Sequence, residues 1–146
     1  MSVFGALDVS ATGMTAQQLR MDTISENIAN VNTTRGKDGK PYKRKTVLFE
    51  EKSYPSFSES LSMANRNNIG KGVKASKIVE DNSEGSKVYD PSHPDADEDG
   101  YVTYPNVNTV TEMTNMIDAT RAFEANVTVM NSTKGMALKA LDIGQS

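Results

Sequence analysis

The five prolines of this chain divide it into three parts. They stand at positions 41, 55, 91, 94 and 105, so the two terminal segments contain none. Proline removes a helical hydrogen bond and clashes with the preceding turn, which confines long helices to proline-free segments. The sequence therefore predicts a long helix at each end and a different structure between them.

The N-terminal segment has the apolar spacing of an amphipathic helix. Apolar residues recur at alternating intervals of three and four, with interruptions at Gln18 and Ser25. Gly5 and Gly13 should weaken the first turns by about 1 kcal/mol each. We predict that the face toward a partner helix, the helix seam, is formed here by Leu7, Met14, Met21, Ile24 and Ile28.

The C-terminal segment carries a longer version of the same pattern. A helix of about 35 residues would extend for roughly 52 Å. Thr109 and Glu112 have the spacing of a capping box at its start, and Gly144 is a suitable stop. On this helix the seam is predicted to comprise Met113, Met116, Phe123, Val127, Met130 and Leu141.

The middle of the chain has the composition of β-structure. Segments 42–51, 72–80 and 100–104 are rich in strand-forming residues and are separated by Gly, Pro, Asn and Ser, whereas 58–71 is predicted to be a loop. The predicted fold is α+β, with the terminal helices packed antiparallel as a coiled-coil-like pair and both termini at the same end. Residues 1–34 and 106–146 would form a helical assembly core, and 35–105 an inserted β-rich domain.

Short polar residues occupy positions where a helix usually has either apolar or charged ones. Asn27, Asn30 and Asn32 follow the first helical stripe, although Asn is a poor helix former. On a helical wheel a third face of small and polar residues lies between the apolar and acidic faces, which suits close approach of a second neighbour. The alternative is ordinary solvent exposure. Candidates for polar contacts between subunits are Thr23, Asn27, Asn30, Asn126 and Asn131.

Charge is segregated within the middle part. Residues 35–45 contain six basic groups, and residues 80–99 contain eight acidic ones. One interpretation is two solvated loops that are adjacent in one chain. The other is that the basic segment of one subunit meets the acidic loop of another and sets register. The second hypothesis assigns charged assembly patches to Lys43, Arg44, Lys45, Asp95, Asp97 and Asp99.

No catalytic site is predicted. The chain has no cysteine, and His93 is its only histidine, so a thiolate nucleophile, a histidine-based triad and a transition-metal site have no basis. Segment 36–40 is predicted to be a turn and not a phosphate-binding loop. The stretch DADEDG at 95–100 has the alternate carboxylates of a calcium loop, but the twelfth position is Asn106 where a bidentate Glu is required.

Composition limits the remaining functions. The hydrophobic fraction of 36% is low for a chain that builds a compact core alone, and the net charge of −3 disfavours nucleic-acid binding. The start lacks the basic and apolar regions of a secretory signal. We therefore expect a chain that stays in the cytoplasm or leaves it by another route.

Four segments resemble the bacterial flagellar basal-body rod proteins, in particular those of the proximal rod. The resemblance extends over nearly the whole chain, and the segments that carry it read ISENIANVNTTR (24–35), PYKRKTVLF (41–49), YDPSHPDADEDGYVTYPNVN (89–108) and EMTNMIDATRAFEANVTVMNSTKGMALKALDIG (112–144). Segment 52–85 shows no such match.

The resemblance implies a non-enzymatic subunit without cofactor, metal, nucleic-acid or small-molecule ligand. Such proteins leave the cell through the flagellar type III export apparatus without a cleaved signal. They polymerise helically with copies of themselves and with other rod proteins, outside the inner membrane, into the drive shaft that transmits motor torque and continues the export channel. The implied neighbours include the rod–membrane-ring adaptor and the membrane ring. The alternative, from a different class, is a secreted calcium-binding interaction module that uses the DADEDG loop.

Overall fold

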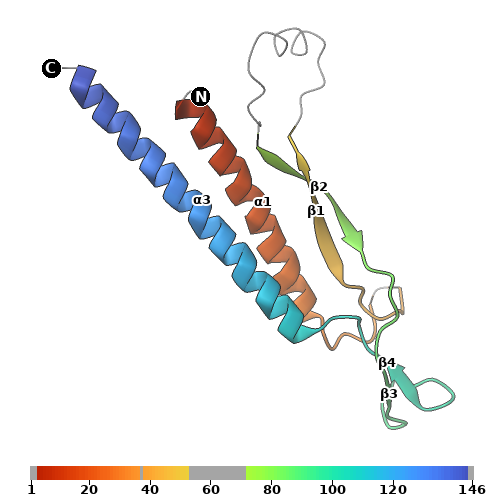
Figure 1. Cartoon of the computed structure of the whole chain (residues 1–146). Helices are drawn as coiled ribbons and strands as arrows, with labels where there is room; N and C mark the ends of the chain where they lie inside the picture. Colours follow the sequence, from red (N-terminus) through yellow and green to blue (C-terminus); the bar gives the residue numbers. More distant parts are fainter. Residues whose placement is uncertain (1–2, 37, 53–71, 145–146) are drawn as a thin grey trace, which may run out of the picture.

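The computed structural model describes residues 3–36, 38–52 and 72–144. A long helix at each end of the chain flanks β-strands in the middle of the sequence, which confirms the predicted α+β fold (Figure 1). The predicted loop at 58–71 lies outside the described residues. The elements are α1 (Val3–Ala29), β1 (Lys45–Glu51), β2 (Val73–Glu80), β3 (Lys87–Tyr89), β4 (Tyr101–Thr103) and α3 (Thr109–Gly144).

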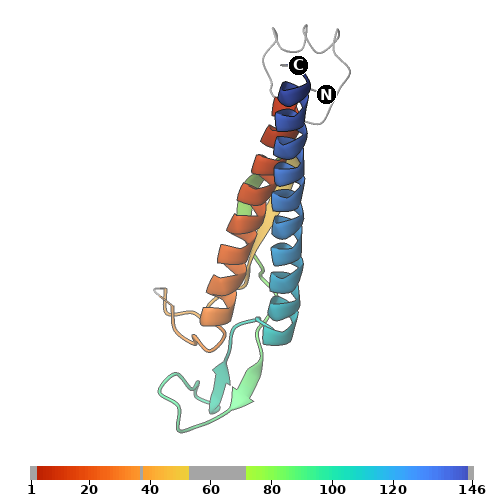
Figure 2. The same ribbon diagram turned by 90° about the vertical axis from the view of Figure 1, so that its left-hand side faces the viewer.

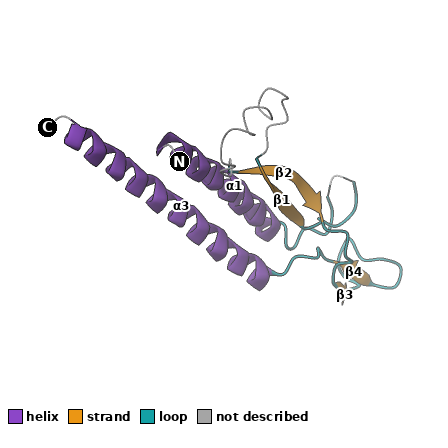
Figure 3. Cartoon of the chain, turned by 45° about the horizontal axis from the view of Figure 1, so that its top comes forward, coloured by secondary structure: helices purple, strands orange, loops and turns teal. Residues whose placement is uncertain are grey.

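Helix α1 is the central element of the molecule. It packs along α3 on one side and against the β1–β2 hairpin on another (Figure 1). The helices run antiparallel with both chain ends at the same end of the pair, as predicted, and the β3–β4 hairpin lies beyond the opposite end (Figure 2). The third view shows the β1–β2 hairpin on the side of α1 away from α3 (Figure 3).

Small residues on α1 permit both contacts. A Cβ at Gly13 would come within 2.9 Å of the Asn126 side chain on α3, so this glycine lets the two helices approach closely. On the other face Ala16 is buried, and the Thr12 hydroxyl accepts a hydrogen bond from the backbone of Val73 at 3.2 Å. The third, small and polar face that was noted in the sequence is therefore largely covered by the chain's own hairpin.

The hairpin β1–β2 is antiparallel and contains one irregularity. Pairing runs from Lys45 opposite Glu80 to Glu51 opposite Val73, with a register shift between Leu48 and Phe49. The strand starts three residues later than the predicted 42. The reason is that Tyr42 donates its backbone N–H to Thr33 at 3.1 Å, outside the ladder.

A second, smaller hairpin pairs β3 with β4. Strand β4 matches the predicted segment 100–104, whereas β3 was not predicted, because three residues whose side chains are all exposed give no alternation. Tyr89 and Tyr101 are cross-strand partners whose rings lie edge to face at 5.3 Å. Gly100 immediately precedes β4 and has a φ of 79°, a left-handed conformation that favours glycine.

The start of α3 differs from the predicted capping box. Asn108 is the N-cap: its Oδ1 accepts the backbone N–H of Thr111 at 3.1 Å. Glu112 does not return to the helix start, because its side chain turns inward and is almost fully buried. The local motif was outweighed by a tertiary contact.

The hydrophobic core of the described residues is small. Its buried apolar side chains are Ala16, Ile24, Val47, Val102 and Ala119, while fifteen large apolar side chains are exposed. Within the described ranges no helix is apolar enough over a sufficient length to span a membrane. The fold thus leaves much apolar surface for contacts with other molecules.

Candidate assembly surface and a buried polar junction

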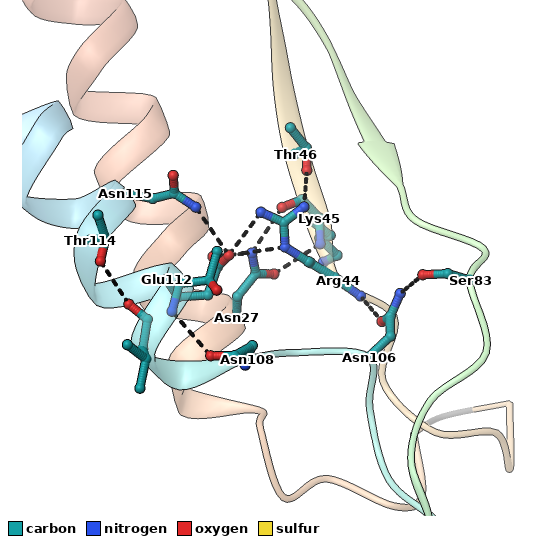
Figure 4. A network of polar contacts seen from close by, with 12 residues as sticks. Asn27, Arg44, Lys45, Thr46, Ser83, Asn106, Asn108, Glu112, Thr114 and Asn115 are labelled. Atoms are coloured by element: carbon teal, nitrogen blue, oxygen red, sulfur yellow. Dashed lines mark hydrogen bonds and ion pairs between the residues drawn. The ribbon is translucent and has the colours of Figure 1, made fainter.

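Asn27 is the centre of a buried polar network at the end of α1 (Figure 4). Its amide nitrogen donates to the backbone carbonyl of Lys45 at 2.8 Å, and its amide oxygen accepts the backbone N–H of the same residue at 2.9 Å. The side chain thus pairs with Lys45 as a neighbouring strand would. It also donates to Glu112 at 2.9 Å and accepts from the Tyr42 hydroxyl at 2.8 Å, which satisfies all four hydrogen bonds of the amide.

Glu112 connects the second helix to the same place. The side chain is 1% exposed, and its Oε1 accepts from both Nε and Nη2 of Arg44, at 2.9 and 2.8 Å. Asn115 adds a longer contact at 3.4 Å. A carboxylate can be buried here because a guanidinium and an amide replace its hydration. We call Asn27, Arg44, Asn106 and Glu112 the polar junction.

Asn106 extends the polar junction into the loops. Its Oδ1 accepts the backbone N–H of Arg44 at 2.9 Å, and its amide donates to the Asp81 carbonyl at 3.2 Å and to Ser83 at 2.9 Å (Figure 4). The segment before α3, the start of β1 and the loop after β2 are therefore joined. The result is a fixed connection between the helix pair and the β part.

Tyr42 has the most strongly shifted pKa near the polar junction. Burial, with the nearby carboxylates of Glu26, Glu112 and Glu80, raises the pKa of its hydroxyl to about 12. Ionisation would add a negative charge beside these carboxylates. The hydroxyl therefore stays protonated and continues to donate to Asn27 at ordinary pH.

The residues predicted for polar contacts between subunits have different surroundings. Thr23 and Asn27 are buried within the chain, and Thr23 donates to the Leu19 carbonyl at 2.8 Å. The amides of Asn30 and Asn126 donate to carbonyls one turn earlier on their own helices. Asn131 is exposed. The polar groups of Thr23 and Asn27 are bonded within the chain, and the contacts between subunits stay a prediction for all five residues.

The charged patches are also paired largely within the chain. Arg44 bonds to Glu112, and Lys45 forms an ion pair with Glu26 at 2.6 Å. Lys43 donates to Asn82 at 2.6 Å, and Asp95 accepts from Thr34 at 2.9 Å and from Arg35 at 3.4 Å. Asp97 accepts the backbone N–H groups of Asp99 and Tyr101. Among the described residues, which leave out Lys37, the ion pair of Arg35 with Asp95 is the one direct ionic contact between the basic segment and the acidic loop.

The acidic loop uses its carboxylates as turn caps. The bonds of Asp97 to the two following backbone donors close the 97–101 turn, and Asp90 does the same for Ser92. The Ser92 bonds lower the pKa of Asp90. Among the described residues no group of three or more acidic, His or Cys side chains is arranged to hold a metal ion. The calcium alternative has no support in this geometry.

The predicted helix seam spans a range of burial. Ile24 is buried, and Met21 accepts a hydrogen bond from Thr120 across the helix pair at 3.5 Å. The exposed members are Met113, 56% exposed, and Leu141, 64% exposed. The half-buried members are Leu7, Met14, Met21, Ile28, Met116, Phe123, Val127 and Met130.

Helix α3 carries a second apolar surface that the chain leaves uncovered. We call it the outer face of α3; its members are exposed, and successive members are three, four, seven or twelve residues apart. They are Val110, Met113, Ile117, Val129, Met136 and Ile143. A helix of 36 residues with apolar residues on both sides requires partners on both sides.

Comparisons with known proteins define the class to which this fold and surface belong. Residues 7–37 match the family model described as flagella basal body rod protein, and residues 98–143 match the model of the C-terminal part of the flagellar basal body rod FlgEFG proteins. The two matches cover the helical ends, including Asn27 and Glu112. These ends are those of a flagellar rod protein.

The relatives give the particular family. The FlgC rod proteins of Bacillus subtilis and Borreliella burgdorferi are 50% and 46% identical to this chain, and that of Salmonella typhimurium is 34% identical. Each alignment covers 99% of this chain and 99% or 100% of the relative. The chain belongs to the FlgC family of flagellar basal-body rod proteins, which confirms the resemblance found in its motifs.

Proposed function

We propose that the chain is a non-enzymatic structural subunit of the proximal rod in the bacterial flagellar basal body. It polymerises helically with copies of itself and with other rod proteins, and the assembled rod transmits motor torque and continues the export channel. The observation that carries this proposal is the uncovered outer face of α3 in a member of the FlgC family.

The terminal segments and the middle of the chain have different roles in this proposal. Residues 1–34 and 106–146 form the assembly core, and 35–105 form an inserted domain that contacts neighbours on the outside. The polar junction supports a rigid link between them, because Asn27 and Glu112 of the core hold Arg44 and Lys45 of the insert. Torque applied to the core would reach the insert through these bonds.

The finer expectations belong to the same proposal. The subunit would be exported through the flagellar type III apparatus without a cleaved signal and act outside the inner membrane. Its neighbours there would include the rod–membrane-ring adaptor and the membrane ring. The absence of cysteine is consistent with export as an unfolded chain that needs no oxidation step.

Complementation tests the proposal. A flagellated strain without its own FlgC should regain swimming and hooks when it expresses this chain. A variant with Val110, Ile117 and Met136 changed to Ser should express and fold but leave basal bodies arrested before the hook. Full swimming by that variant would contradict the role given to the outer face of α3.

A further inference from the structure

Arg20 of α1 is a half-buried cation whose charge has no partner in the described part of the chain. Arg44 and Lys45 are also half-buried, but each has a carboxylate partner at 2.8 and 2.6 Å, and Lys52 has an interaction of its own. In the described ranges, Arg20 is the half-buried cationic side chain without an ion pair or hydrogen bond. Removing a cation from water without a counterion is unfavourable.

The helix itself cannot supply the counterion. Side chains three and four positions away are the ones that reach a helical residue. For Arg20 these are Ala16, Gln17, Thr23 and Ile24, none of which is acidic. An anion for Arg20 must come from another element or another molecule.

The surroundings of Arg20 are polar, and the other cations there already have carboxylate partners. It lines a pocket of about 210 Å³ between α1, β1 and α3, with Thr23, Thr46 and Asn115 as further polar groups. Arg20, Arg44 and Lys45 face this pocket with Glu112 as its one carboxylate, and Glu112 is already bound to Arg44. Lys45 is paired with Glu26 outside this lining, so Arg20 is the one uncompensated charge of the three, and it attracts a further carboxylate.

The chain offers a matching carboxylate on the opposite side of the same helix. Asp22 is exposed and forms no ion pair in the described part of the chain. At 100° per residue it lies about 200° around the helix from Arg20, so the two cannot meet within one copy. A contact between Arg20 of one copy and Asp22 of the next joins two different surfaces, and such head-to-tail interfaces generate open helical polymers.

We propose that Arg20 forms an ion pair with Asp22 of a second copy of this chain. This ion pair sets the lateral register of subunits in the rod. The inference rests on the proposed function and deepens it by naming a contact. The pair is partly buried on the Arg20 side, and polar groups that can hold a carboxylate surround it.

Charge reversal and exchange test the contact in a strain that lacks its own FlgC. R20E and D22R should each reduce the swimming halo at least tenfold, whereas R20E/D22R should recover most of it and R20K should swim normally. K87E and E84R, which make the same charge changes in the exposed β part, are the matched controls. Circular dichroism of each purified variant should match the parent chain.

Cross-linking between positions 20 and 22 of neighbouring subunits tests the same contact without charge reversal. The chain has no cysteine, so a short bismaleimide should link R20C/D22C subunits into ladders in isolated basal bodies but should not link R20C or D22C alone. Normal swimming by R20E, failure of the exchange to restore swimming, or absence of the ladder would each overturn the contact. The proposed function would fail separately, if the parent chain itself did not restore hooks.

Discussion

The amide of Asn27 on α1 donates to the carboxylate of Glu112 on α3 at 2.9 Å, across 85 positions of sequence. Both side chains are buried, and each also holds the first part of β1, Asn27 through the backbone of Lys45 and Glu112 through Arg44. Three elements thus meet in one hydrogen-bonded group. Loss of any member leaves buried partners unsatisfied.

Replacement of Asn27 should be costly. N27A removes four hydrogen bonds and leaves Glu112 and the Lys45 backbone partly unsatisfied, so we expect a loss of about 2–3 kcal/mol in the free energy of unfolding. N27D should cost more, because it puts a carboxylate beside Glu112. Urea denaturation followed by circular dichroism measures both. N131A on the exposed side of α3 is the control and should change stability by less than about 0.5 kcal/mol; an N27A curve that coincides with it would contradict the role of the junction.

The ion pair between Arg44 and Glu112 should show strong coupling. E112Q keeps the shape but removes the charge that compensates Arg44, and R44M leaves the carboxylate buried with one partner fewer. A double-mutant cycle with E112Q/R44M should give a coupling energy of about 1–3 kcal/mol, reduced from the value for fully buried pairs because Arg44 is a quarter exposed. The same cycle on Lys139 and Asp142, an exposed pair at 3.7 Å, should give about 0.3–0.5 kcal/mol or less. Equal coupling in the two cycles would refute this assignment.

The close approach of the helices at Gly13 predicts the direction of the stability change when a methyl group is added there. Gly to Ala within a helix is worth about 1 kcal/mol of intrinsic propensity, but the added Cβ would lie 2.9 Å from the Asn126 side chain. G13A should therefore be neutral or destabilising, while G13A/N126A should be more stable than N126A. Thermal melting of the four chains decides this. Stabilisation by G13A alone would contradict this prediction and would mean that the Asn126 side chain moves aside at little cost.

The raised pKa of Tyr42 predicts a loss of stability in alkali. An unfolded tyrosine releases its proton near pH 10.0, whereas the folded hydroxyl holds it to about pH 12. Between these values the folded chain binds more protons than the unfolded chain, so the free energy of unfolding falls as pH rises. Y42F should reduce this fall, as measured by melting from pH 9 to 12. Tyrosinate absorbance should show that Tyr42 ionises at a higher pH than the exposed Tyr89, with Y42F and Y89F used to assign the two signals. If the stability of Y42F fell with pH as steeply as that of the parent chain, the raised pKa would be contradicted.

The existing hypothesis on charged patches needs a different set of variants. Reversal of Arg44 or Lys45 would break the internal bonds to Glu112 and Glu26, so an assembly defect would not report on subunit contacts. Lys40 is exposed, and so are Glu98 and Asp99. Charge reversals at these three positions test for pairing between subunits without disturbing the polar junction; unchanged swimming would exclude the hypothesis for them.

The sequence by itself determined both helices, three of the four described strands and the family. Proline-free termini and apolar repeats gave both helices, and segments 72–80 and 100–104 gave β2 and β4 almost to the residue, because periodicity and breakers are local properties. The motifs around Asn27 and in 89–108 were enough for the rod family. The bounds of 42–51 were less accurate, because Tyr42 and Arg44 bond outside the strand pair.

Only the tertiary structure decided what the polar residues do. Glu112 had the spacing of a capping residue, and Asn27 that of a contact between subunits, yet the two meet each other, Arg44 and Lys45 in a buried junction. No local pattern encodes a pair separated by 85 positions. The physical reason is that a buried polar group takes whichever partner the packing brings within hydrogen-bond distance, and the order of elements in space sets that partner.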